Sequence, residues 1–296
     1  MKILRYKLTL AVELVVAIGL VSCQQDNVPT PDLPNPASAQ ALRDGISASI
    51  PKMYQLIKHG DATLSYYENG KLKKVSLGAN IRGSYLTNIT YAYSTNSIVS
   101  TLTRNSKIMQ VITYSLDANT GYCYESSQID YIPLGTNAIQ EQETILSYLY
   151  NGKGQLVNVT DKKAPNSKTL FGYNVIGDLN KISYFGYSGS TPGPSLLAES
   201  TFYYEQLGGD PILDDLSPVN LEQANLPDQY LKIFGKQGKH LVKMITEKST
   251  PGGKYYNYTL NNDGYVTSRQ TYNISGGALV ETRLYDYLVT EIGFHL

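Results

Sequence analysis

One short motif recurs along the chain: an aromatic or leucine residue enters a turn of Asn, Asp and Gly, and apolar residues return from it. The clearest copies are YLYNGKGQLVNV at 148–159, GYNVIGDLNKI at 172–182 and YTLNNDGYV at 258–266. Turn residues of this kind between two aromatic or β-branched runs are the sequence signal of a β-hairpin. The chain is therefore expected to consist mostly of antiparallel hairpins.

Looser copies extend this pattern over most of the sequence, with turns predicted at 68–71, 94–97 and 117–121. Short turns join antiparallel neighbours, and a long excursion follows at about 205–240 before strands resume. We expect an all-β fold, an antiparallel meander of about twelve to fifteen strands that curls into a barrel or a barrel-like curved sheet. Apolar return residues stand three apart, as in Leu156 and Val159, which predicts a bulge or strong twist after the turn.

The first 22 residues have the anatomy of a secretory signal peptide. Lys2, Arg5 and Lys7 precede a mostly apolar stretch at 8–21. Leu20, Val21 and Ser22 stand directly before Cys23, which resembles the signal-peptidase recognition sequence of bacterial lipoproteins. The resemblance implies cleavage before Cys23, which would then carry lipid. The alternatives are an ordinary signal with a coincidental cysteine, or a terminal helix of the fold.

Two further segments precede the hairpin domain. Residues 23–36 follow as a polar tether with four prolines, which predicts an extended spacer. Residues 37–60 are expected to be partly helical, because Pro51 suits a helix start, Met53, Leu56 and Ile57 form an apolar face, and Gly60 suits an end. The hairpin domain is then 61–296.

Composition limits the possible functions. The whole chain carries 25 basic and 25 acidic residues, and no basic stripe typical of nucleic-acid binders is visible. Cys123 is the only thiol left if Cys23 is lipidated, and its aromatic strand context predicts packing as a small hydrophobe. Tyrosine occurs 26 times against five Phe and no Trp. Its placement beside the turns favours an architectural role over a sugar-binding surface.

The core Tyr-Asn-x-x-Gly-x-Leu of residues 150–156 and 173–179 resembles the YD repeat of RHS-type proteins, with Asn151 and Asn174 in place of the motif's Asp. Signal, Pro-rich tether and hairpins together resemble uncharacterised Bacteroidetes-type lipoproteins whose domain is described as porin-like. The resemblance covers about residues 60–290 and implies an architecture, with no catalytic residue to carry over. Interrupting lysines and short strands favour a soluble barrel over a membrane-spanning one.

The residues that could carry chemistry form no familiar constellation. His59, His240 and His295 have no metal-ligand spacing. Residues 185–190 depart from a nucleophile elbow at Ser190. Turns 117–121 and 261–264 resemble calcium loops but lack the distal Glu. The pair Asp214–Asp215 is the remaining candidate for a hydrolase site. We expect no catalytic residues, no metal and no cofactor.

The leading hypothesis is a non-enzymatic cell-envelope lipoprotein, anchored to the outer membrane through its N-terminal lipid, that binds or scaffolds. It would face the cell surface or the periplasm, and its partners would be a glycan or an envelope protein rather than nucleic acid. The alternatives are a lipocalin-like carrier of a small apolar ligand and an envelope glycan hydrolase.

Overall fold

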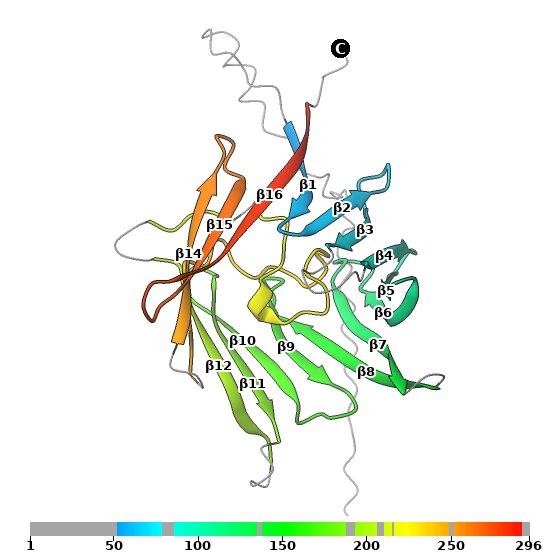
Figure 1. Cartoon of the computed structure of the whole chain (residues 1–296). Coiled ribbons are helices and arrows are strands. Elements are labelled where there is room, and N and C mark those ends of the chain that lie inside the picture. Colours follow the sequence, from blue (N-terminus) through cyan, green and yellow to red (C-terminus); the bar gives the residue numbers. More distant parts are fainter. Residues whose placement is uncertain are drawn as a thin grey trace, which may run out of the picture. The chain divides into compact units, whose positions relative to one another are not determined.

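The hairpins form one closed barrel of sixteen strands, in which every neighbouring pair is antiparallel and β1 pairs with β16 (Figure 1). This computed structural model describes residues 52–78, 86–134, 138–187, 193–205, 210–214, 216–248 and 252–291. The expected all-β meander is confirmed, and the sheet closes rather than remaining open.

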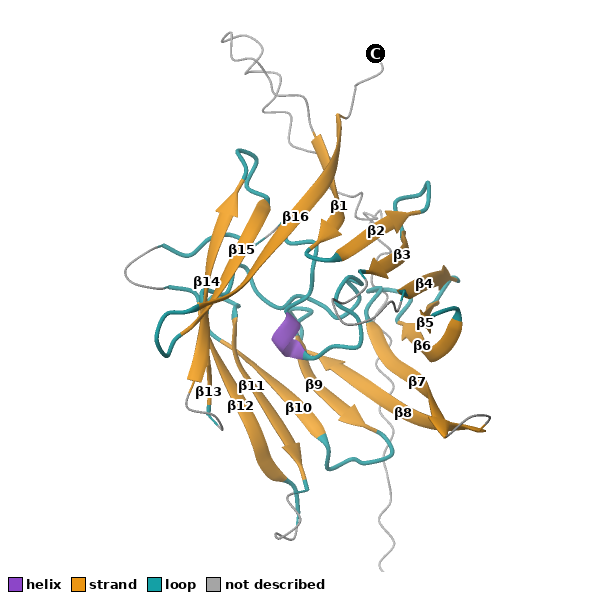
Figure 2. Cartoon of the chain, in the orientation of Figure 1, coloured by secondary structure: helices purple, strands orange, loops and turns teal. Residues whose placement is uncertain are grey.

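In chain order the strands are β1 (Lys52–His59), β2 (Ala62–Tyr66), β3 (Leu72–Leu77), β4 (Thr87–Tyr93), β5 (Ser97–Arg104), β6 (Lys107–Leu116), β7 (Cys123–Leu134), β8 (Ala138–Tyr150), β9 (Leu156–Asp161), β10 (Lys168–Tyr173), β11 (Leu179–Gly186), β12 (Ser195–Tyr203), β13 (Met244–Glu247), β14 (Gly252–Leu260), β15 (Val266–Asn273) and β16 (Leu279–Glu291). Among the described residues the helical content is one short turn, the 3₁₀ helix η1 (Glu222–Ala224) (Figure 2). None of the described helical structure is long and apolar enough to cross a membrane.

The repeated turns share one hydrogen-bonding scheme that explains their sequence. In the β8–β9 turn, the Asn151 side-chain oxygen accepts the backbone NH groups of Lys153 (2.9 Å) and Gln155 (3.1 Å). Gly154 follows with a φ of 73°, a left-handed conformation that glycine adopts without steric cost. Asn261 accepts the corresponding NH groups in the β14–β15 turn. The Asn and the Gly are therefore both required by the turn itself.

The predicted bulge after the turn is confirmed. The pairing of β8 with β9 shifts register between Leu149 and Tyr150, and that of β10 with β11 shifts between Gly172 and Tyr173. Because of this shift, Leu179 and Ile182, three positions apart, are both fully buried inside the barrel.

In five strand pairs a tyrosine hydroxyl donates to the carbonyl left at the bulge. The tyrosine near the end of an even-numbered strand donates to the first residue of the strand before it: Tyr93 to Leu72 (2.8 Å), Tyr150 to Cys123 (2.7 Å), Tyr173 to Leu156 (2.9 Å), Tyr204 to Leu179 (2.7 Å) and Tyr287 to Val266 (3.0 Å). Phenylalanine would fill the same space without this bond. The excess of Tyr over Phe thus has an architectural cause, as the sequence indicated.

The helix expected within 37–60 is wrong where the structure describes it. Residues 52–59 form strand β1, and the remainder of that segment lies outside the described residues. Leu56 points into the barrel and is 2% exposed, while Met53, on the expected apolar helix face, is 52% exposed. Pairing with β16 and β2 satisfies the backbone here, so tertiary context overrides the local helix pattern.

The excursion between β12 and β13 folds into the barrel. We name it the inner segment: residues 210–243, apart from 215. It lies within the ring of strands (Figure 1, yellow). Phe234 is fully buried between the rings of Tyr114 and Tyr148, at centroid distances of 6.0 and 5.4 Å. The buried Asp228 accepts the Tyr91 hydroxyl at 2.8 Å, which connects the inner segment to β4. The inner segment therefore fills much of the barrel interior.

The outer face carries charge within its strands. Lys181 on β11 precedes the buried Ile182, so it points outward. It pairs with Glu199 on β12 at 3.4 Å. Further ion pairs of the same exposed kind join Lys58 to Asp286 (3.9 Å), Lys163 to Glu143 (2.7 Å), and Lys162 to Glu125. The buried core is mostly apolar and tyrosine, while the outward face mixes these ion pairs with exposed apolar side chains such as Leu149, Leu284 and Leu288.

Candidate ligand pocket inside the barrel

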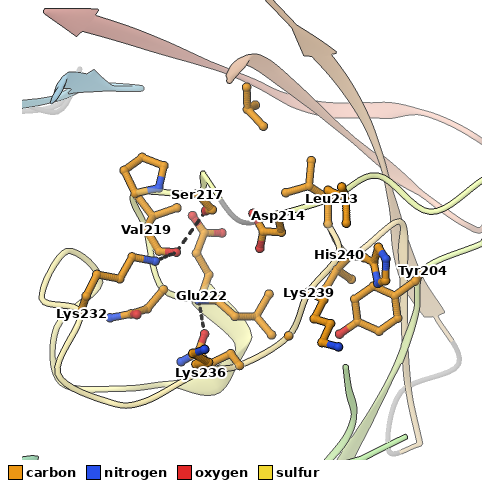
Figure 3. A pocket seen from close by; sticks show the side chains of 18 of the residues that line it. Tyr204, Leu213, Asp214, Ser217, Val219, Glu222, Lys232, Lys236, Lys239 and His240 are labelled. Atoms are coloured by element: carbon orange, nitrogen blue, oxygen red, sulfur yellow. Dashed lines mark hydrogen bonds between the residues drawn. The ribbon is translucent and has the colours of Figure 1, made fainter. Parts of the chain in front are cut away.

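A pocket of about 820 Å³ lies between the inner segment and the inward faces of β14, β15 and β16. The strands contribute Tyr258, Val266, Arg269 and Tyr285 to its wall, and the inner segment contributes most of the rest. Figure 3 shows Lys232 on one side of this pocket, with His240 and Tyr204 on the opposite side. A space of this size suits a small organic molecule.

The wall beside His240 is fixed by a buried carboxylate. Asp178, in the β10–β11 turn, is fully buried and accepts the backbone NH groups of Lys239 (2.6 Å) and His240 (3.2 Å). Its second oxygen lies 2.8 Å from Nδ1 of His240. With Asp178 as the acceptor, Nδ1–H donates, and the other ring nitrogen is directed away from Asp178. Asp178 therefore attaches the inner segment to the hairpin turn and orients the imidazole.

A second wall contains paired charges that largely neutralise each other. Glu222 lies 3.2 Å from Arg269 and also contacts Arg283. Both arginines reach Glu281 as well, Arg283 at 2.6 Å and Arg269 at 3.4 Å. Two guanidinium groups thus face two carboxylates between η1 and the last two strands. This cluster fixes η1 against the barrel wall and leaves little net charge for a ligand.

Lys232 stands apart from that cluster. Its ammonium donates to the backbone carbonyl of Val219 at 2.7 Å, which uses one of its three donors. The residue is exposed overall and its side chain lines the pocket. Partial loss of hydration beside the protein lowers the pKa of Lys232 to about 8, and the nearby charge of Asp214 acts in the opposite direction. Lys232 is therefore a cation with donors available toward the pocket.

His59 is buried on the inner face of β1 and takes no part in the pocket lining. It is 4% exposed, contacts the rings of Tyr230 and Tyr285, and has Nδ1 3.2 Å from the Tyr230 hydroxyl. Burial and the positive charges of Arg283 and Arg269 lower its pKa to about 3. It is a neutral core residue at physiological pH.

The structure places several other candidates from the sequence. Asp214 lines the pocket, whereas Asp215 lies outside the described residues. Cys123 is fully buried, and burial raises the pKa of its thiol to about 12, which agrees with a packing role. Asp117 accepts the NH groups of Asn119 and Thr120, so it caps its own turn.

Among the described residues no group of three or more His, Cys, Asp and Glu side chains is placed to hold a metal ion. The lipidation site Cys23, the recognition residues Leu20, Val21 and Ser22, Ser190 and His295 all lie outside the described part of the chain.

Sequence reasoning missed Lys232 and the pairing of Asp178 with His240. The two partners stand 62 positions apart, so no local spacing relates them. One signal was present: Asp178 occupies the turn position that holds Gln155 and Tyr265 in the other clear copies. An acid there is unusual for the repeat and marks the turn that the inner segment reaches.

Two solved structures have a similar fold. A porin-like protein from Bacteroides uniformis ATCC 8492 gives a TM-score of 0.54 at 20% sequence identity, and the match covers 81% of this chain and 99% of that chain. A porin-like protein from Bacteroides vulgatus ATCC 8482 gives 0.50 at 13% identity, covering 80% and 99%. Neither a protein-family model nor a curated protein matches the sequence. The porin-like fold implied by the sequence resemblance is thereby confirmed, while YD-repeat membership and lipidation stay predictions.

Proposed function

We propose that this protein is a non-enzymatic binding module of the cell envelope, tethered to the outer membrane by lipid on Cys23, whose barrel stands in water and holds a small ligand in the inner pocket. The observation that carries the proposal is that an inner segment fills much of the barrel and lines a pocket, while ion pairs such as Lys181–Glu199 and Lys58–Asp286 lie on the outward face of the strands. The porin-like fold of the two Bacteroides structures is compatible with an envelope protein.

The exterior supports a barrel in water rather than in lipid. A lysine on the lipid-facing side of a membrane barrel costs about 2–4 kcal/mol at the bilayer midplane. Lys181 and Lys58 each face outward within a strand, and each pairs with an acid on the neighbouring strand. A membrane-spanning arrangement would require these pairs to lose their hydration. The tether, not the barrel, is therefore the part we assign to membrane attachment.

The pocket supports a binding role over a purely scaffolding one. Its walls come from segments distant in sequence, and buried hydrogen bonds fix their geometry, as with Asp178 and His240. A pre-formed pocket of mixed polarity is the usual form of a small-molecule site. The hydroxyls of the tyrosines in the hairpin repeats, in contrast, donate to carbonyls at the bulges. Binding of a glycan or an envelope protein on the outer surface stays a separate prediction.

Attachment can be tested by giving the protein a cleavable signal peptide without a lipid site and replacing Cys23 by Ser. We expect this variant to be released in soluble form, while the native chain incorporates an alkyne-labelled palmitate and remains with membranes. A released chain that needs detergent to stay in solution would contradict a water-exposed barrel. Protease digestion of intact cells then decides between the cell surface and the periplasm.

Ligand binding can be tested by native mass spectrometry of the protein purified from its source cells. The expected result is one added small-molecule mass that disappears on denaturation. A clean protein mass, in samples extracted without detergent, would count against the pocket as a binding site.

A further inference from the structure

The charges around the pocket do not balance. Its wall carries four lysine or arginine side chains, Lys232, Lys236, Lys239 and Arg269, against two carboxylates, Asp214 and Glu222. The pair of Arg269 and Glu222 at 3.2 Å removes one charge of each sign. Three lysines then stand against Asp214 and the buried Asp178 behind His240, so these side chains sum to a net positive charge before any ligand enters.

The positive charge has a defined position. Lys232 stands across the pocket from His240 in Figure 3, and its ammonium is held by the Val219 carbonyl. A lysine fixed in this way, with protein around it, attracts an anion more strongly than a lysine in open water, because the surrounding medium screens the charge less. Lys236 and Lys239 are exposed, as Lys232 is, and add to the field without a comparable anchor.

The rest of the wall includes a substantial apolar surface. Leu213, Leu241, Val242 and Val266 line the same space, and two tyrosine rings, Tyr258 and Tyr285, contribute their faces or edges. A fully hydrated inorganic anion would leave this surface unused. An anionic group on an apolar body would match both parts of the wall.

Resting on the proposed binding role, we propose that the pocket takes a small amphipathic organic anion, with a carboxylate or phosphate head at Lys232 and an apolar body against the leucine and valine side chains. The ammonium supplies charge-assisted hydrogen bonds to the head group. Transfer of the apolar body from water to the apolar side chains of the wall contributes further binding free energy.

The test compares two dyes with the same anilinonaphthalene body: 8-anilinonaphthalene-1-sulfonate, which is anionic, and N-phenyl-1-naphthylamine, which is neutral. With the full-length protein we expect one-to-one binding of the anionic dye, at least ten times tighter than the neutral dye. Lys232→Met should weaken the anionic dye at least tenfold and leave the neutral dye unchanged. Lys232→Arg should retain binding, and Lys153→Met, at an exposed turn outside the pocket, is the matched control.

Two further measurements sharpen the result. Raising the pH from 7 to 9 should weaken the anionic dye in the native protein, and it should have little effect in Lys232→Met, because Lys232 loses its proton over this range. Displacement of the dye by decanoate and by decyl phosphate, with decan-1-ol as the neutral control, distinguishes a carboxylate head from a phosphate head.

Equal binding of both dyes, or an unchanged anionic dye in Lys232→Met, would overturn the anion proposal and leave the pocket as a binding site. Failure of both dyes to bind would also overturn it. The wider binding role is judged separately, by whether protein from its source cells carries a bound small molecule.

Discussion

Replacing a repeat tyrosine by phenylalanine should destabilise the barrel without changing its shape. Tyr173 and Tyr204 donate to the carbonyls of Leu156 and Leu179, at 2.9 and 2.7 Å. Both acceptor residues are fully buried, so water cannot replace the lost donor. A neutral hydrogen bond contributes about 0.5–1.5 kcal/mol, and an unsatisfied buried acceptor costs about 1–3 kcal/mol. We therefore expect each Tyr→Phe change to lower the free energy of unfolding by about 1.5 kcal/mol.

The assay is urea denaturation followed by far-ultraviolet circular dichroism, which does not depend on the fluorescence of the altered tyrosine. Tyr124→Phe is the control, because that side chain is 53% exposed and should change stability by less than about 0.5 kcal/mol. The double variant Tyr93→Phe/Tyr204→Phe changes residues on β4 and beside β12, strands that are not neighbours in the barrel. The two losses in the free energy of unfolding should therefore add to about 3 kcal/mol.

Losses below about 0.5 kcal/mol in both Tyr173→Phe and Tyr204→Phe would refute the reasoning. They would mean that the bulge carbonyls find other donors, and that tyrosine is used here for its ring alone. A strongly non-additive double variant would instead point to coupling around the whole barrel.

Three further changes test other parts of the fold. The pKa of His59 is lowered to about 3 in the folded protein, whereas in the unfolded chain it is near 6.5. The free energy of unfolding should therefore fall as the pH drops from about 6.5 toward 3, by at most about 1.4 kcal/mol per pH unit. His59→Gln should flatten this dependence in urea titrations at pH 7, 5 and 4. Gly235→Ala should lower Tm far more than Gly70→Ala, because both have positive φ but only the first would place a Cβ 2.4 Å from the Gly154 carbonyl oxygen; equal losses in calorimetry would contradict this. Phe234→Ala should cost about 3–5 kcal/mol, since its ring is fully buried, and a loss under about 1 kcal/mol would show that the inner segment packs loosely.

The parts of the fold that could be predicted are those whose interactions join residues close together in the sequence. The turns could be predicted because Asn151 and Gly154 satisfy requirements within five residues of chain. The bulge could be predicted from the spacing of Leu179 and Ile182 for the same reason. Strand β1 was mistaken for a helix because its main partner, β16, lies at the other end of the barrel domain.

The pocket could not be predicted from residues that are close together in the sequence. Lys232 gains its position from the Val219 carbonyl and from the way the inner segment enters the barrel. Asp178 meets His240 only once that entry has occurred. Composition and motif spacing carry no record of such long-range packing, so the excursion at 205–240 could be seen as irregular but not as interior.

The closing pair of β1 and β16 sets an order of events for the newly made chain. Lys52 lies opposite Glu291, so the two strands that complete the ring belong to the first and last parts of the barrel to be synthesised. Contacts between such distant segments form slowly, because the intervening chain must first be arranged. Until β16 arrives, β1 has one unpaired edge, which is a site for wrong pairing with other chains. Slow refolding at low concentration, and aggregation of chains that lack β16, are the behaviour this topology implies.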